Sequence, residues 1–139
     1  MPAAGPPDGL ADLFLDRSLG RRQVPDLLRS AGLRLRTLAE VYGIPADQDV
    51  DDITWLTYAG EQGWPVLMKD ERIRYRPAET QAVLAHHVQA FCLTSGNLRA
   101  PEMATQILSA VDHIAAACQQ PGPFLYTLSR AGLRPIMLG

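Results

Sequence analysis

Hydrophobic and polar positions follow one another along the chain in a pattern that predicts strands separated by helices. Short apolar runs predict strands at residues 10–16, 33–37, 65–69 and 88–93. Apolar residues at helical spacing predict helices at residues 24–31, 51–62, 77–87 and 101–119. Residues 42–49 are predicted to form a loop, and residues 121–138 a hairpin-like pair of short strands around Ala131 and Gly132.

This order of elements predicts the fold class. Strands joined by helices of this length form βαβ units with right-handed crossovers, and therefore a mostly parallel central sheet with helices on both faces. We expect a three-layer α/β/α fold in a single domain over residues 10–139. Residues 1–9, which are mostly Pro, Gly and Ala, are expected to be a flexible N-terminal leader.

Composition places the chain among globular proteins without a membrane anchor. Of its 139 residues, 47% are hydrophobic and 20% are charged. No run approaches the ~20 apolar residues of a membrane span, and no signal-like segment opens the chain, so we expect a cytoplasmic protein. Cys92 and Cys118 each lie in an apolar run and are expected to be buried thiols.

The distribution of charge is more informative than its sum. The net charge of -2 does not by itself indicate a nucleic-acid-binding protein. Basic residues nevertheless gather between residues 17 and 36 and again between 69 and 76, whereas acidic residues gather between 47 and 52. Clusters of opposite sign therefore alternate along the first half of the chain.

Acidic side chains stand where two of the predicted strands end. Asp16 follows the first strand and Asp70 follows the third. Because parallel strands end at the same edge of a sheet, both carboxylates are expected at the edge where ligands bind in such folds. The helix that starts near residue 51 brings a third acid there. Asp52 is favoured because its helical row continues through apolar positions, and Asp51 is the alternative.

Three carboxylates at one edge repel one another unless a cation lies between them. Mg²⁺ and Mn²⁺ prefer oxygen ligands and retain waters that can attack a phosphodiester. The nearby bases Arg17, Lys69 and Arg72 are then candidates to bind substrate phosphates. Each acid alone also has a structural explanation as a turn former or helix cap, but those explanations do not predict a common location.

The segments FLDRSL, DDITWL and GWPVLMKDERIR, in this order, resemble the PIN-like nucleases, in particular the VapC-type toxins of toxin–antitoxin systems. The resemblance runs from about residue 12 to about residue 98. It implies a metal-dependent endoribonuclease with a doubly wound α/β fold, an RNA substrate, an antitoxin partner and a possible homodimer. Asp16, Asp52 and Asp70 match the three acids of the family pattern and are the expected metal ligands.

The sequence departs from that pattern at the fourth acid, which PIN-type sites often carry after the next strand. Here that loop reads TSGNL and contains no carboxylate. Three alternatives stay open: Asn97 orients a water molecule, Glu71 replaces the missing acid, or the site is weakened. The last alternative leads to a different function, a PIN-like binding or regulatory module without turnover.

Other functions are less well supported by the residues. The chain contains neither GxGxxG nor GxxxxGK[ST], so dinucleotide and P-loop sites are not expected. A phosphoryl hydrolase with Asp16 as nucleophile typically carries a second acid two residues later, where this chain has Ser18. His86, His87 and His113 are expected to be structural, and both tryptophans are expected to pack against the sheet.

Overall fold

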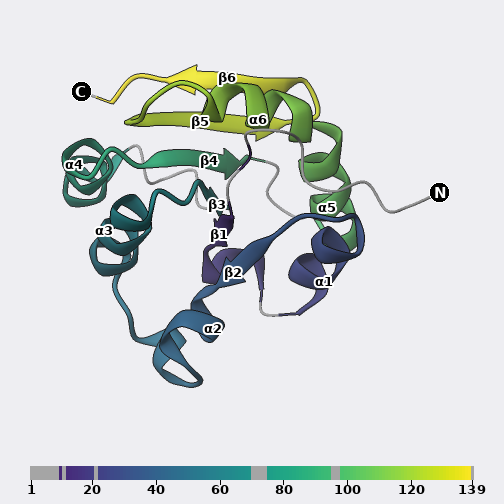
Figure 1. Cartoon of the computed structure of the whole chain (residues 1–139), viewed down its shortest axis with the longest axis horizontal. Helices are drawn as coiled ribbons and strands as arrows, with labels where there is room; N and C mark the ends of the chain where they lie inside the picture. Colours follow the sequence, from purple (N-terminus) through teal and green to yellow (C-terminus); the bar gives the residue numbers. More distant parts are fainter. Residues whose placement is uncertain (1–9, 11, 21, 70–74, 95–97, 139) are drawn as a thin grey trace.

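The computed structural model describes residues 10, 12–20, 22–69, 75–94 and 98–138. Within them, six strands form one sheet in the order β2-β1-β3-β4-β5-β6 (Figure 1). All neighbouring strands are parallel except β6, which is antiparallel to β5. The strands are β1 (Leu13–Leu15), β2 (Leu35–Thr37), β3 (Val66–Met68), β4 (Gln89–Leu93), β5 (Phe124–Ser129) and β6 (Gly132–Ile136).

Helices cover both faces of this sheet, which confirms the predicted three-layer α/β/α architecture. In Figure 1, α1 and α5 lie on one side of the central strands and α3 and α4 on the other. The helices are α1 (Gln23–Ser30), α2 (Leu38–Tyr42), α3 (Asp52–Gln62), α4 (Pro77–Ala85), α5 (Ala100–Ser109) and α6 (Val111–Cys118). Two short 3₁₀ turns, η1 (Arg17–Leu19) and η2 (Ala46–Gln48), follow β1 and α2.

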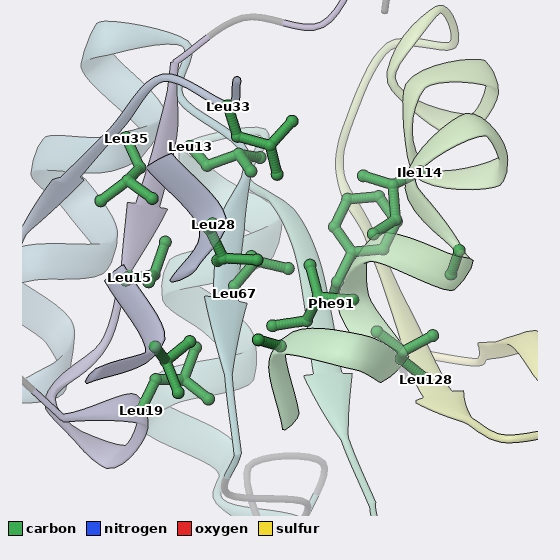
Figure 2. Packing of buried hydrophobic residues seen from close by; sticks show 14 of the residues in the cluster. Leu13, Leu15, Leu19, Leu28, Leu33, Leu35, Leu67, Phe91, Ile114 and Leu128 are labelled. Atoms are coloured by element: carbon green, nitrogen blue, oxygen red, sulfur yellow. The ribbon is translucent and has the colours of Figure 1, made fainter. Parts of the chain in front are cut away.

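Burial on both faces explains why the central strands read as continuous apolar runs. Successive side chains of a strand point to opposite faces. In β1, Leu13 and Leu15 join the core under α1, α5 and α6, part of which is shown in Figure 2, whereas Phe14 joins the core under α3 and α4. Every residue of β1 and β3 is buried.

The predicted single helix over residues 101–119 is wrong, because the chain turns at Ala110, whose φ of -105° and ψ of 3° are not helical. The turn lets α5 pack against α1 while α6 packs against β6. The apolar spacing continues through the turn because Ile107, Ala110 and Ile114 all contribute to the same core. Periodicity alone therefore could not reveal two helices.

Helix α2 was not predicted, although a local signal for it exists. Thr37 and Glu40 form a capping box: the Glu40 amide donates to Thr37 Oγ1 at 3.2 Å, and the Thr37 amide donates to Glu40 Oε1 at 2.9 Å. Such reciprocal bonds satisfy two otherwise unpaired N–H groups at the start of a helix. The predicted loop over residues 42–49 accordingly begins at the last residue of α2 and contains η2.

Helices α3 and α4 approach each other closely at Gly60. A Cβ atom added to this glycine would lie 2.5 Å from the carbonyl oxygen of His86, which caps the end of α4. At the end of α3, Gly63 takes the left-handed conformation with φ of 73°, as predicted for a helix stop. Gly60 therefore allows the close approach of α3 and α4, and Gly63 ends α3.

The described residues also bear on two further expectations, the burial of the cysteines and the lack of a membrane span. Cys92 is buried, whereas Cys118 is only half-buried, and burial raises the pKa of the Cys118 thiol to about 12. No described helix has both the length and the apolar character needed to cross a lipid bilayer. The predicted leader at residues 1–9 lies outside the described residues.

Candidate active site

The candidate site lies where the strand order reverses direction. Strand β2 lies on one side of β1, and β3 lies on its other side, so the chain leaves β1 and β3 in opposite directions. In open α/β sheets, ligands bind in the crevice beyond the carboxyl ends of such strands. A cavity of about 240 Å³ lies there. Its lining residues are Asp16, Arg17, Ser18, Asp52, Trp55, Met68 and Arg76.

Asp16 is the most buried acid in this cavity, with only 7% of its surface exposed. Its Oδ2 accepts hydrogen bonds from the Ser18 hydroxyl at 2.6 Å and from the Ser18 amide at 3.3 Å, so it caps the turn η1. Its Oδ1 is buried and has no hydrogen-bond partner among the described residues. Burial raises the pKa of Asp16, the bonds from Ser18 oppose this rise, and the negative charge of Asp52 adds to it.

Ser18 ties the ends of two neighbouring strands together. Its Oγ donates to Asp16 after β1 and accepts a hydrogen bond from the amide of Lys69 after β3 at 3.0 Å. A single hydroxyl thus fixes both the rotamer of Asp16 and the spacing of the strand ends. From the sequence, Ser18 was notable only because it stands where a phosphoryl hydrolase typically carries a second acid. A hydroxyl residue two positions after a strand-end acid was the signal that could have revealed this role.

The two acids at the start of α3 have different surroundings. Asp51 is exposed and caps the helix, because its Oδ1 accepts the Thr54 amide at 2.7 Å, and hydrogen bonding from Thr54 holds the pKa of Asp51 below its usual range. Asp52 lines the cavity together with Asp16. The structure therefore brings Asp16 and Asp52 together and leaves Asp51 outside their cavity.

A core residue orients Asp52. The indole nitrogen of Trp55 donates to Asp52 Oδ1 at 2.9 Å, and Trp55 is only 1% exposed. Its ring stacks on Phe14 of β1 at a centroid distance of 5.9 Å, and the ring of Trp64 stacks on the same phenylalanine at 5.9 Å. Both tryptophans pack against the sheet, as predicted, and one of them also positions a candidate ligand.

The bases near the cavity differ in what they contact. The guanidinium of Arg17 donates to the backbone carbonyls of Asp47, at 3.2 Å, and of Val50, so it holds the segment that leads into α3. The amide of Lys69 is bound by Ser18. Arg76, which the sequence did not single out as a site residue, lies 3.7 Å from Asp52 Oδ2 and lines the cavity.

Four of the predicted site residues, namely Asp70, Glu71, Arg72 and Asn97, lie outside the described residues. Within the described ranges, no three His, Cys, Asp or Glu side chains are grouped closely enough to hold a metal ion. The histidines therefore form no metal cluster there. Asp16 and Asp52 nevertheless suit a hard cation, because both offer carboxylate oxygens and Asp16 Oδ1 is buried without a described partner.

Comparison with known proteins identifies the family of the chain. A profile of the family described as "PIN like domain" matches residues 12–95. The chain is 42% identical over 122 residues to the Mycobacterium tuberculosis H37Rv protein named "Putative ribonuclease VapC45", a match that covers 86% of this chain and 88% of that protein. No solved structure gave a significant match. By profile and by identity over most of its length, the chain is a VapC-type member of the PIN-like domain family.

Proposed function

We propose that this protein is an endoribonuclease that depends on Mg²⁺ or Mn²⁺ and acts in the cytoplasm as the toxin of a toxin–antitoxin pair. The observation that supports this most directly is the unpaired, buried Oδ1 of Asp16 in a cavity shared with Asp52. A buried acceptor without a partner costs free energy, so a protein keeps one where a ligand completes it. The family and the name of the relative supply the reaction class.

Asp16, Asp52 and Asp70 are the proposed ligands of the cation. When bound, a divalent cation supplies positive charge that polarises a phosphodiester and makes a water molecule more acidic. Ser18 holds Asp16 and Trp55 holds Asp52, so the described acids are oriented before any ligand arrives. Glu71 and Asn97 are the proposed replacements for the fourth acid of the family pattern.

The proposed roles of the bases follow from their contacts. Lys69 and Arg72 are proposed to bind the RNA backbone as counter-charges to its phosphates. Arg17 is proposed to act chiefly by fixing the segment before α3, and thereby the position of Asp52, because its guanidinium already binds two backbone carbonyls. An RNA contact by Arg17 stays a prediction.

The proposed partner is an antitoxin protein, and the proposed assembly is a homodimer, both as the VapC-type resemblance implies. Binding of an antitoxin over the acidic cavity would block the substrate. Co-expression with the product of a small neighbouring reading frame, followed by purification, would show whether the two proteins form a complex.

A nuclease assay tests the function. The purified protein is incubated with RNA in Mg²⁺ or Mn²⁺ and, in parallel, in EDTA, beside the variants Asp16→Asn and Asp70→Asn. We expect cleavage only with metal and only in the unmodified protein. RNA binding without cleavage would instead support the regulatory module, and metal-dependent cleavage by both variants would overturn the assignment of these acids.

A further inference from the structure

Arg76 is the base that faces the acids of the cavity. Its NH1 lies 3.7 Å from Asp52 Oδ2, and the two side chains are only partly exposed, at 35% and 29%. The other described guanidinium in the cavity, that of Arg17, donates to backbone carbonyls. Arg76 is therefore the described side chain that supplies positive charge to a carboxylate of the cavity.

The contact between Arg76 and Asp52 is longer than another ion pair in the same molecule. Arg29 and Glu40 form two charge-assisted hydrogen bonds at 2.7 and 2.8 Å, which is the usual length for such bonds. The contact between Arg76 and Asp52 is about 1 Å longer, beyond hydrogen-bonding distance. The position of Asp52 is set by Trp55 at 2.9 Å. Asp52 therefore has a partner that orients it whether or not Arg76 lies beside it.

The backbone of Arg76 is anchored at the start of α4. Arg76 immediately precedes Pro77, the first residue of α4, and its carbonyl accepts the Thr80 amide at 3.0 Å and the Thr80 hydroxyl at 3.3 Å. The start of a helix carries partial positive charge, which adds to that of the guanidinium. Arg76 thus presents a cation from a fixed point at the mouth of an acidic cavity.

We propose that Arg76 neutralises Asp52 while the site lacks metal, and that it transfers to a phosphate oxygen of the RNA once a divalent cation binds the acids. This inference rests on the proposed ribonuclease function. A divalent cation on the same carboxylates repels the guanidinium and outcompetes its single charge. In the proposal, the guanidinium displaced from Asp52 binds a phosphate, for which its planar fork of donors is suited.

The variant Arg76→Gln should change the affinity for Mn²⁺ and the affinity for RNA in opposite directions. Without a competing cation on Asp52, Mn²⁺ should bind about two- to fivefold more tightly in the absence of RNA. Without the guanidinium on the phosphate, KM for RNA should rise about tenfold or more. A merely structural role for Arg76 would weaken both, because a distorted cavity binds metal and substrate less well.

The experiment measures Mn²⁺ affinity from the electron paramagnetic resonance signal of the unbound ion and KM from RNA cleavage. Arg76→Lys, which keeps the charge, should restore the metal affinity of the unmodified protein while leaving KM elevated. Arg134→Gln on β6 removes one exposed positive charge away from the cavity and should change neither value. Circular dichroism confirms that each variant is folded.

The possible failures are distinguishable. If the unmodified protein binds Mn²⁺ but cleaves no RNA, the proposed ribonuclease function is wrong, and so is the proposed contact between Arg76 and an RNA phosphate. The comparison of Mn²⁺ affinities still tests whether Arg76 neutralises Asp52 in the absence of metal. If the unmodified protein cleaves RNA, the inference is overturned when Arg76→Gln leaves both values unchanged or shifts both in the unfavourable direction.

Discussion

Replacing Asp16 with asparagine should stabilise the protein in the absence of metal and remove its stabilisation by metal. Asp16 is 7% exposed, its Oδ1 has no described hydrogen-bond partner, and Asp52 adds negative charge to the same cavity. An unsatisfied buried group costs about 1–3 kcal/mol. Because the asparagine amide must still be buried, we expect a gain of about 1–2 kcal/mol in the free energy of unfolding, or a melting temperature higher by about 3–8 °C.

Metal should reverse this order. A cation present at a hundredfold excess over its dissociation constant stabilises the folded state that binds it by about 2.7 kcal/mol. The unmodified protein should therefore melt at a higher temperature in Mn²⁺ than in EDTA, whereas the Asp16→Asn variant should show little change. Thermal melts followed by circular dichroism in both buffers measure the four values. Equal stabilisation of both proteins by Mn²⁺, or a variant less stable than the unmodified protein in EDTA, would refute the reasoning.

The same variant has a defined pH dependence. Burial raises the pKa of Asp16 in the folded state, so the folded protein holds this proton more tightly than the unfolded chain does. The Asp16 carboxyl therefore favours folding at low pH, and this contribution is lost as the pH rises through the folded-state pKa. In EDTA, the stability difference between the variant and the unmodified protein should be largest near neutral pH, should shrink as the pH falls through the raised folded-state pKa of Asp16, and should stop changing below the ordinary pKa of a carboxyl.

Three further substitutions test the orientation of Asp16, the cap of α3 and the packing of α3 against α4. Ser18→Ala should weaken Mn²⁺ binding about tenfold to a hundredfold, because the hydrogen bond that orients Asp16 is lost. Ser18→Thr should restore the binding, and unchanged binding in Ser18→Ala would reject this role. Asp51→Ala should lower the melting temperature by a few degrees through loss of a helix cap but leave RNA cleavage intact, and loss of cleavage would show that Asp51 belongs to the site. Gly60→Ala should destabilise the protein by about 1–3 kcal/mol in urea unfolding, because its methyl group meets a carbonyl at 2.5 Å, whereas Glu61→Ala on the exposed face of the same helix should not.

The sequence predicts the layers of this fold well because strands that are buried on both faces appear as continuous apolar runs. Strands β1 and β3 are buried throughout, and their runs of apolar residues were recognisable as central parallel strands. The turn at Ala110 does not interrupt the apolar spacing, because the residues on both sides of it face one core. Tertiary contacts decide such a turn, and a single sequence does not contain them in readable form.

For the candidate site, the sequence predicted which chain positions meet but not how the side chains are held. Strand ends and helical phase were enough to bring Asp16 and Asp52 into one cavity. The partners that orient them, Ser18 and Trp55, stand two and three residues after the acids, but many pairs at these spacings form no bond, so spacing alone did not identify them. Arg76 was not predicted as a site residue because it is one of several bases in a cluster, and only the structure shows that it lies beside Asp52.

The bond between Trp55 and Asp52 makes the site observable without a label. Trp55 donates its indole N–H to Asp52 Oδ1, and the emission of an indole depends on the charge next to its nitrogen. A cation on Asp52 should therefore change the intrinsic fluorescence of the protein. Trp64 stacks on Phe14 and does not line the cavity. A Trp64→Phe variant would therefore leave Trp55 as a single optical reporter of ligand arrival.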